Sequence, residues 1–261
     1  MSAPVLAARR LAFGYRGKPV GRDVNLEVHA GEVLCLLGPN GSGKTTLFKT
    51  MLGLLAPQGG EVRLGGRPIA ALARDEIARS VAYVPQAHAA QFPFRVADMV
   101  VMGRTAHLGP FAAPGKEDHT KARAALDALG IGALADAEYT RISGGQRQLV
   151  LVARALAQDA PAIVMDEPTA SLDFGNQVVV LSEVRRLAGR GLAVLLSTHD
   201  PDHAFSIGHR VALLDAGRLV AHGRPEEVLT PQSLRAVYGV SVAVERLSQG
   251  QTVCAPDYGV S

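Results

Sequence analysis

The first chemically informative stretch of the sequence is GPNGSGKTT, which runs from Gly38 to Thr46. It matches the pattern G-x-x-x-x-G-K-[ST] and follows an apolar run typical of a buried strand. Glycines let the backbone wrap around phosphate groups, and the helix that begins here adds the partial positive charge of its N-terminus. We therefore expect Lys44 to contact the β and γ phosphates of a nucleotide and the Thr45 hydroxyl to ligate Mg²⁺. The other residues expected to bind at this loop are Gly38, Pro39, Asn40, Gly41, Ser42, Gly43 and Thr46.

Acidic and imidazole side chains follow two further apolar runs. AIVMDE ends in Asp166 and Glu167, and LAVLLSTHD places His199 just beyond another strand. The carboxyl ends of parallel strands share one edge of a sheet, and ligands bind at that edge. We expect Asp166 to hold Mg²⁺ through water and Glu167 to polarise an attacking water. His199 is then placed to hydrogen-bond a γ-phosphate.

The same region offers a less favoured alternative, a metal site built from His199, Asp200, Asp202 and His203. These ligands would have to meet across a strand end and the turn at Pro201. Neither a cysteine nor a further acid completes the set that such a site needs. The phosphate-binding interpretation of His199 is therefore the stronger one.

A second glycine-rich helix start occurs in ISGGQRQLVLVARAL. The Ser143 hydroxyl, the amides of the two glycines that follow it and the helix dipole converge on an anion. If this helix belongs to an inserted subdomain, it cannot fold back onto the chain's own Lys44 without burying that subdomain. We therefore predict a head-to-tail dimer, in which each Ser143 loop closes over the ATP held by Lys44 of the other copy.

These motifs call for an α/β fold in which strands and crossover helices alternate. We predict a P-loop NTPase core with a mostly parallel sheet, an N-terminal antiparallel β part and an inserted helical subdomain. Glycine-bounded GGEVRLGGRPI predicts a hairpin, and HTKARAALDALGI from His119 predicts a helix. Within a single domain of residues 1–261, the core with its β part spans 1–87 and 157–225. The helical subdomain with the Ser143 loop spans 88–156, and a C-terminal extension with two short helical patterns spans 226–261.

Composition supports a packed globular protein. The chain has 261 residues, of which 48% are hydrophobic, enough to bury a substantial core. Apolar runs such as VLCLL are too short to span a bilayer, which takes about 20 residues. The net charge of +3 is small and the basic residues are scattered, so nucleic-acid binding is not expected. Two cysteines, Cys35 and Cys254, make a disulfide framework improbable.

In kind and in order, the motifs resemble those of the ATP-binding subunits of ABC transporters, and the resemblance covers nearly the whole chain. It implies that Tyr15 stacks on adenine, the alternative being an aromatic packed in its own loop. It also implies that Gln86 senses Mg²⁺ and the attacking water, and that Asp173 communicates between two sites. Ile142 stands where leucine is usual. The matching features are Tyr15, the loop 38–45, Gln86, the signature residues Ser143, Gly144, Gly145 and Gln146, then Asp166, Glu167, the segment 171–173 and His199.

The stretch AHAAQFPFRVADMVVMGRTAHLGPF is similar to the region of importer ATPases that docks a coupling helix of the permease. For Phe92, Phe94 and Met102, core packing and partner contact are both open. The similarity is to ATPases that serve iron-siderophore, haem and cobalamin permeases, with molybdate relatives in the same group. It implies a peripheral subunit at the cytoplasmic face of the inner membrane, working with a permease and, indirectly, an extracytoplasmic substrate-binding protein.

Other functions fit less well. A molybdate or related oxyanion importer is the main alternative for the cargo. A soluble ABC-type ATPase acting on nucleic acid or ribosomes would call for a coiled-coil insertion, tandem ATPase halves or a basic tract, and the sequence has none of them. A metabolic kinase would leave the Ser143 loop and Glu167 without a role.

Overall fold

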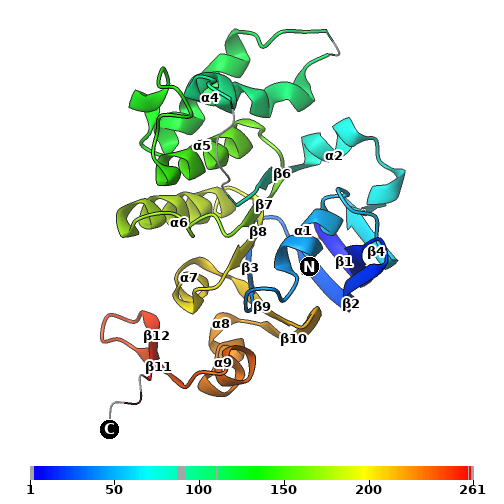
Figure 1. Ribbon diagram of the computed structural model, residues 1–261, viewed down its shortest axis with the longest axis vertical. Coiled ribbons are helices and arrows are strands. Elements are labelled where there is room, and N and C mark those ends of the chain that lie inside the picture. Colours follow the sequence, from blue (N-terminus) through cyan, green and yellow to red (C-terminus); the bar gives the residue numbers. More distant parts are fainter. Residues whose placement is uncertain (1–2, 87–91, 110, 258, 260–261) are drawn as a thin grey trace.

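The computed structural model describes residues 3–86, 92–109, 111–257 and 259. Its centre is a sheet of strand order β10-β9-β3-β8-β7-β6 (Figure 1). Neighbouring strands from β9 to β6 pair in parallel, and β10 pairs antiparallel with β9 at one edge. This arrangement confirms the predicted, mostly parallel core. The strands are β3 (Val33–Leu37), β6 (Val81–Val84), β7 (Ala162–Asp166), β8 (Ala193–Thr198), β9 (Arg210–Asp215) and β10 (Arg218–Gly223).

Strand β3 shows why an uninterrupted apolar run becomes the middle of this sheet. Leu34 and Leu36 pack into one hydrophobic core, and Val33, Cys35 and Leu37 pack into a second core on the other face. Successive side chains of a strand point to opposite faces, so a strand covered on both sides must be apolar throughout. The covering helices are α1 (Lys44–Met51) on the first face and α6 (Phe174–Ala188) and α7 (Pro201–Ile207) on the second.

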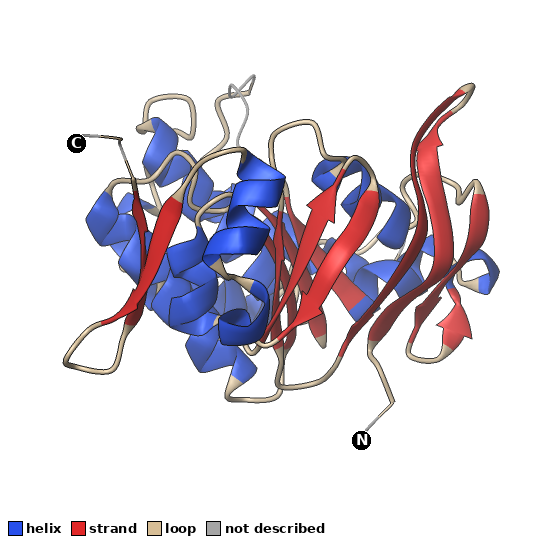
Figure 2. Ribbon diagram, turned by 90° about the horizontal axis from the view of Figure 1, so that it is seen from below, coloured by secondary structure: helices blue, strands red, loops and turns tan. Residues whose placement is uncertain are grey.

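The N-terminal part forms a separate antiparallel sheet of order β2-β1-β4-β5, seen at one end of the molecule in Figure 2. Phe13 of this sheet belongs to the same hydrophobic core as Leu34 and Leu36 of β3, and it is fully buried there, as is Phe48 of α1. The predicted glycine-bounded hairpin is the β4-β5 pair. The elements here are β1 (Leu6–Tyr15), β2 (Lys18–Val28), β4 (Gly59–Leu64), β5 (Arg67–Pro68), a 3-10 turn η1 (Ile69–Ala71) and α2 (Arg74–Ser80).

Helices follow one another between β6 and β7. The helix expected from His119 is present but begins earlier, at Lys116, because the Asp118 carboxylate accepts the Gly115 N–H at 2.9 Å and caps the first turn. Helix α5, which follows Ser143, contacts α3, α4, β6 and the turn η2. The elements are α3 (Val96–Val101), η2 (Met102–His107), α4 (Lys116–Ala128), η3 (Gly132–Leu134) and α5 (Gly144–Ala157).

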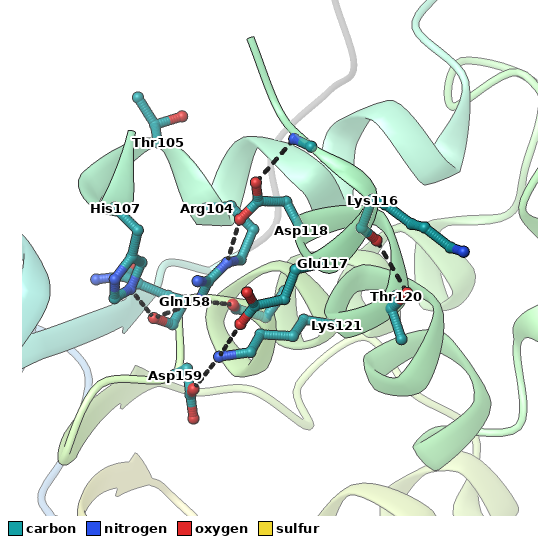
Figure 3. A network of polar contacts seen from close by, with 12 residues as sticks. Arg104, Thr105, His107, Lys116, Glu117, Asp118, Thr120, Lys121, Gln158 and Asp159 are labelled. Atoms are coloured by element: carbon teal, nitrogen blue, oxygen red, sulfur yellow. Dashed lines mark hydrogen bonds and ion pairs between the residues drawn. The ribbon is translucent and has the colours of Figure 1, made fainter. Parts of the chain in front are cut away.

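A buried ion pair ties α4 to the end of α5 (Figure 3). Arg104 donates from Nε to Asp118 Oδ1 at 3.0 Å and from Nη1 to the carbonyl of Ala157 at 3.0 Å. Nearby, Lys121 Nζ donates to Asp159 Oδ2 at 2.7 Å. The pKa of the Asp118 carboxyl is lowered, first by the Gly115 amide and then by Arg104. Since Ala157 directly precedes the loop into β7, these bonds fix where the helical part joins the sheet.

Beyond β10 the chain forms α8 (Pro225–Val228), α9 (Pro231–Tyr238) and a two-stranded antiparallel hairpin of β11 (Val242–Arg246) and β12 (Thr252–Pro256). The two short helical patterns expected in this extension form α8 and α9. Figure 1 shows these elements at the end of the molecule opposite α4. Over the described ranges, no helix combines the length and apolar character needed to cross a membrane.

We expect Arg104→Met to lower the unfolding temperature by more than about 4 °C, because it leaves the Asp118 carboxylate and the Ala157 carbonyl without their buried partner. Arg67→Met is the matched control, since Arg67 pairs with Glu76 at 2.9 Å on the exposed surface. Thermal unfolding followed by circular dichroism measures both. Equal shifts for the two variants would contradict the structural role of Arg104.

Candidate functional site

The loop between β3 and α1 is shaped by glycines and leads into the N-terminus of a helix. Gly43 has φ 105°, a left-handed conformation that side chains rarely adopt, and it directly precedes the first turn of α1. A Cβ at Gly38 would lie 2.1 Å from the carbonyl oxygen of Leu214, so only glycine allows this close approach to β9. The first turn of α1 carries no acidic side chain. Its N-terminal amides are therefore free to bind an anion.

The ammonium group of Lys44 is folded back onto this loop. Its Nζ donates to the carbonyl of Gly38 at 2.7 Å and to that of Pro39 at 3.2 Å, and the residue is only 6% exposed. Glu167 Oε1 lies 3.4 Å away. A buried cation of this kind needs anionic or carbonyl partners, and phosphate oxygens could replace the ones it has here.

Asp166 and Glu167 end strand β7 at the same edge. Asp166 is 2% exposed, and its Oδ1 accepts the hydroxyl of Ser197 at 2.7 Å. The Ser197 hydroxyl in turn accepts the Glu167 N–H at 2.9 Å. Glu167 has φ 48°, which is uncommon for a residue with a side chain. This turn of the backbone lets two consecutive carboxylates reach the crevice, although neighbours on a strand normally point to opposite faces.

His199 meets the same carboxylate from the next strand. Its Nδ1 lies 3.5 Å from Glu167 Oε2, and more than half of its side-chain surface is exposed. Lys44, Glu167 and His199 thus come together from the ends of β3, β7 and β8, which are adjacent in the sheet. His203 instead lies inside, bonded to Thr198 Oγ1 at 3.0 Å. Among the described residues, no group of three His, Cys, Asp or Glu side chains could hold a metal by itself.

The remaining expected ligands differ in how far they are exposed. Thr45 is exposed on the first turn of α1, whereas Thr46 is buried behind it. Gln86 is exposed two residues beyond β6, and Tyr15 is 44% exposed at the end of β1. An exposed Tyr15 ring is free to stack on a base. Pro39, Asn40 and Gly41 lie in the turn of the loop, where Pro39 is partly exposed and Asn40 and Gly41 are exposed.

Two observations indicate that the loop fits a nucleotide with Mg²⁺. The Ser42 hydroxyl is buried without a hydrogen-bond partner in the described part of the chain, as expected of a group whose partner is a ligand. The oxygen donors Thr45, Gln86 and Asp166 also match the hard ligands that Mg²⁺ prefers when substrate phosphates complete its shell.

The Ser143 loop is well formed and faces outward. Ser143 Oγ accepts the Gln146 N–H at 3.2 Å, and Gln146 Oε1 accepts the Ser143 N–H at 2.9 Å, a reciprocal cap of α5. Ser143 and Gly144 are exposed, and Gly145 and Gln146 are partly so. Asp173 caps α6 by accepting the Asn176 N–H at 2.8 Å. These groups lie on a surface of the chain where a second molecule could reach them.

Sequence reasoning missed two residues of this site. Ser197 bridges Asp166 and Glu167, and the available signal was a hydroxyl in the otherwise apolar AVLLST, two positions before His199. Tyr238 lies in the C-terminal extension, where burial raises its pKa to about 12 against an opposing effect of the Gly38 backbone N–H. No local pattern in PQSLRAVYG points to this site, because the approach depends on how α9 packs.

Comparison with known proteins finds relatives over most of the chain. Residues 22–170 match the family model described as ABC transporter. A hemin import ATP-binding protein of Thermobifida fusca is 40% identical over 92% of this chain and 84% of that protein. A zinc transport system ATP-binding protein of Treponema pallidum is 38% identical over 92% of this chain and 89% of that protein.

Solved structures give the same result for the fold. A metal-chelate type ABC transporter in an inward-facing conformation has a TM-score of 0.85 and 32% identity, over 98% of each chain. A dimeric bacterial ABC transporter cassette has a TM-score of 0.76 and 27% identity, over 84% of this chain and 98% of that one.

Lys44→Ala should weaken ATP binding at least about a hundredfold, because charge-assisted hydrogen bonds to the phosphates are lost. Lys49→Ala, in the last turn of the same helix, is the control. Titration calorimetry with ATP and Mg²⁺ measures both affinities. Wild-type affinity for Lys44→Ala would exclude the phosphate-binding role of this side chain.

Proposed function

The chain belongs to the ABC transporter family as one of its ATP-hydrolysing, ATP-binding subunits, and on this premise we propose that it energises an importer of haem or another metal chelate. The proposal that the chain hydrolyses ATP rests on the cluster of Lys44, Glu167 and His199 beside the N-terminus of α1. The cargo part is supported by the similarity to the hemin import protein and to the metal-chelate type transporter.

In the proposed reaction, each side chain acts on a different atom of the substrate. Lys44 leaves its own loop carbonyls and binds the β and γ phosphates of ATP, where it offsets developing negative charge. Glu167 accepts a proton from the attacking water, and His199 donates a hydrogen bond to the γ-phosphate. The Ser197 hydroxyl accepts a hydrogen bond from the Glu167 backbone N–H, which holds Glu167 in place, and donates its own proton in a hydrogen bond to Asp166.

Thr45, Gln86 and Asp166 are the residues proposed to hold Mg²⁺, with Asp166 acting through water. When bound, the ion neutralises charge on the phosphate oxygens and helps to orient them. The buried bond from Ser197 leaves Asp166 with a fixed orientation for this task. Gln86 is exposed two residues beyond the end of β6.

The Ser143 loop is proposed to complete the site of a second copy. Its exposed hydroxyl and the α5 N-terminus would contact the γ-phosphate bound by Lys44 of the other subunit in a head-to-tail dimer. Gly144, Gly145 and Gln146 belong to the same contact, and Asp173 lies next to it as the proposed link between the two sites. The similarity to a dimeric cassette supports this arrangement.

A groove with a volume of 740 Å³ is the proposed docking site for the permease. Apolar side chains of the core and of the helical part line it together, including Leu54, Ile77 and Met102, and the charged residues in the lining are Arg74 and Arg154. Burial lowers the pKa of Arg154. The groove therefore favours a helix with an apolar face and an acidic group, as expected for a permease segment at the cytoplasmic face of the inner membrane.

The segment expected to dock this helix is largely accessible. Phe92 is 62% exposed and Phe94 is 43% exposed, and they lie near each other with ring centroids 6.0 Å apart. Met102 is also exposed, so core packing does not describe these three side chains. Residues 87–91 and 110 of the expected docking stretch lie outside the described residues. We therefore propose that the exposed Phe92, Phe94 and Met102 contact the permease.

Transport measurements test the cargo. The chain would be purified with its permease and binding protein, reconstituted in liposomes, and assayed for ATP-driven uptake of haem, an iron chelate, cobalamin, zinc and molybdate in parallel. Accumulation of haem or another chelate supports the proposal. Uptake of molybdate or zinc alone would show that the proposed metal-chelate cargo is wrong. ATPase activity stimulated by nucleic acid or ribosomes, without a permease, would overturn the importer role.

Glu167→Gln should bind ATP with near-normal affinity but hydrolyse it at least about a hundredfold more slowly, because the amide cannot accept the proton of the attacking water. The ATP-bound variant should accumulate as a dimer in size-exclusion chromatography. Glu226→Gln, an exposed change on α8, is the control and should keep wild-type turnover. Wild-type turnover of Glu167→Gln would contradict its role as the base.

Leu54→Glu should prevent copurification with the permease while leaving the ATPase activity of the isolated chain unchanged, since it places a carboxylate in the apolar groove. Leu247→Glu is the matched control, because Leu54 and Leu247 are 54% and 44% exposed and Leu247 lies beyond β11. Retention of the permease by Leu54→Glu would place the docking site elsewhere.

A further inference from the structure

The C-terminal hairpin of β11 and β12 lies against α7, the helix that begins just after His199. Strand β12 contacts α7, and strand β11 contacts α9. Val244 and Cys254 of the hairpin pack against the hydrophobic core to which Ala204 and Ile207 of α7 belong. Figure 1 shows the hairpin and α7 close together at the lower end of the molecule. The extension is therefore a neighbour of the loop that carries His199.

A side chain in the first turn of α7 is bonded to the backbone of this hairpin. The Cys254 N–H donates to Asp202 Oδ1 at 2.7 Å. Over the described ranges, the Asp202 carboxylate makes no other hydrogen bond. Burial raises the pKa of this carboxyl, and the Cys254 N–H opposes the rise. Since a partly buried carboxylate without a donor is costly, this bond stabilises the contact between the hairpin and the helix.

From Asp202, hydrogen bonds continue to both sides of His199. The Asp202 N–H donates to Asp200 Oδ1 at 2.9 Å, and the Asp200 N–H donates to Thr198 Oγ1 at 3.1 Å. Thr198 Oγ1 is also bonded to His203 Nδ1 at 3.0 Å, and His203 Nε2 lies 3.4 Å from Asp200 Oδ2. The residues before and after His199 are thus held by one network, which includes the first turn of α7.

The His199 ring has little support of its own. Its Nδ1 lies 3.5 Å from Glu167 Oε2, and the side chain is 59% exposed. Within the described part of the chain, no hydrogen bond holds the ring. Its direction therefore depends on the backbone between Thr198 and Asp200. A small displacement of a reacting group lowers the rate strongly, so a shift at the start of α7 would affect His199 and its approach to Glu167.

We propose that Asp202 is a positioning residue for ATP hydrolysis, because its carboxylate ties the C-terminal hairpin to the start of α7 and thereby holds His199 beside Glu167. This inference rests on the roles proposed above for His199 and Glu167. Asp202 acts through the backbone on either side of His199, so its loss lowers turnover and leaves the affinity for ATP unchanged. The bond gives the C-terminal extension a part in catalysis.

Two substitutions at Asp202 in the full chain test the bond from the side of α7. Asp202→Ala should lower kcat about fivefold, the loss expected for one hydrogen bond, with KM for ATP within about twofold of wild type. Asp202→Asn should restore most of the turnover, since its amide oxygen still accepts the Cys254 N–H. Steady-state ATPase kinetics and thermal unfolding measure both variants. Glu245→Ala, which removes an exposed carboxylate of the same hairpin, is the control.

The same bond can be removed from the hairpin. Cys254→Pro lacks the N–H donor and should lower kcat to the level of Asp202→Ala. The double variant should be no slower than either single one, because all three lack the same bond. Cys254→Ala keeps the N–H and should retain wild-type kcat, which separates the amide from the thiol. Should Cys254→Pro fail to fold, the two Asp202 variants decide the question.

Three results would overturn the proposal: wild-type kcat for Asp202→Ala, equal losses in Asp202→Ala and Asp202→Asn, or a raised KM at unchanged kcat. His199→Ala in the same series tests the premise separately. If His199→Ala turns over normally, the proposed role of His199 is wrong. If it is slow while Asp202→Ala is normal, only the positioning role of Asp202 fails.

Discussion

The buried ammonium group of Lys44 is the interaction around which the site is organised. It has lost most of its water and is held by two carbonyls of its own loop and by Glu167. Such a charge is stable in the interior only while oxygen atoms surround it. In the proposed function, the phosphates of ATP compete with the loop carbonyls and the carboxylate for the same cation, so nucleotide binding rearranges the partners of Lys44. Glu167 is the group most affected by this exchange.

The scaffold makes this exchange possible by bringing strand ends together. Strands β3, β8 and β7 are neighbours; Glu167 and His199 directly follow β7 and β8, and Lys44 begins the helix that follows β3. Apolar side chains on both faces of β3 leave the sheet no freedom to shift, since a slip by one residue would exchange the two cores. The rigid part of the molecule thus carries the groups whose mutual distances matter.

The parts proposed to meet partners lie on the surface instead. The Ser143 loop is capped by its own side chains but remains exposed, and the groove lined by Leu54 and Met102 lies where the core and the helical part meet. A change in the angle between these parts would alter the groove and the Ser143 surface together. This geometry offers a physical route from ATP binding to a permease, because α5 contacts both α3 and strand β6.

The sequence by itself determined the type and order of the main elements and the position of the glycine-rich loop with Lys44 between a strand and a helix. Local patterns carry this information: a glycine-lysine loop between an apolar strand and a helix, or a Ser-Gly-Gly helix start, depends on residues close together in the chain. The predicted start of α4 was three residues too late, because the hydrogen bond from the Gly115 N–H to Asp118 decides where the helix begins. Only the tertiary structure decided the left-handed turn at Glu167, the bridging hydroxyl of Ser197 and the approach of Tyr238 to Gly38. Each of these depends on contacts between segments far apart in sequence, and such contacts are set by packing rather than by any local preference.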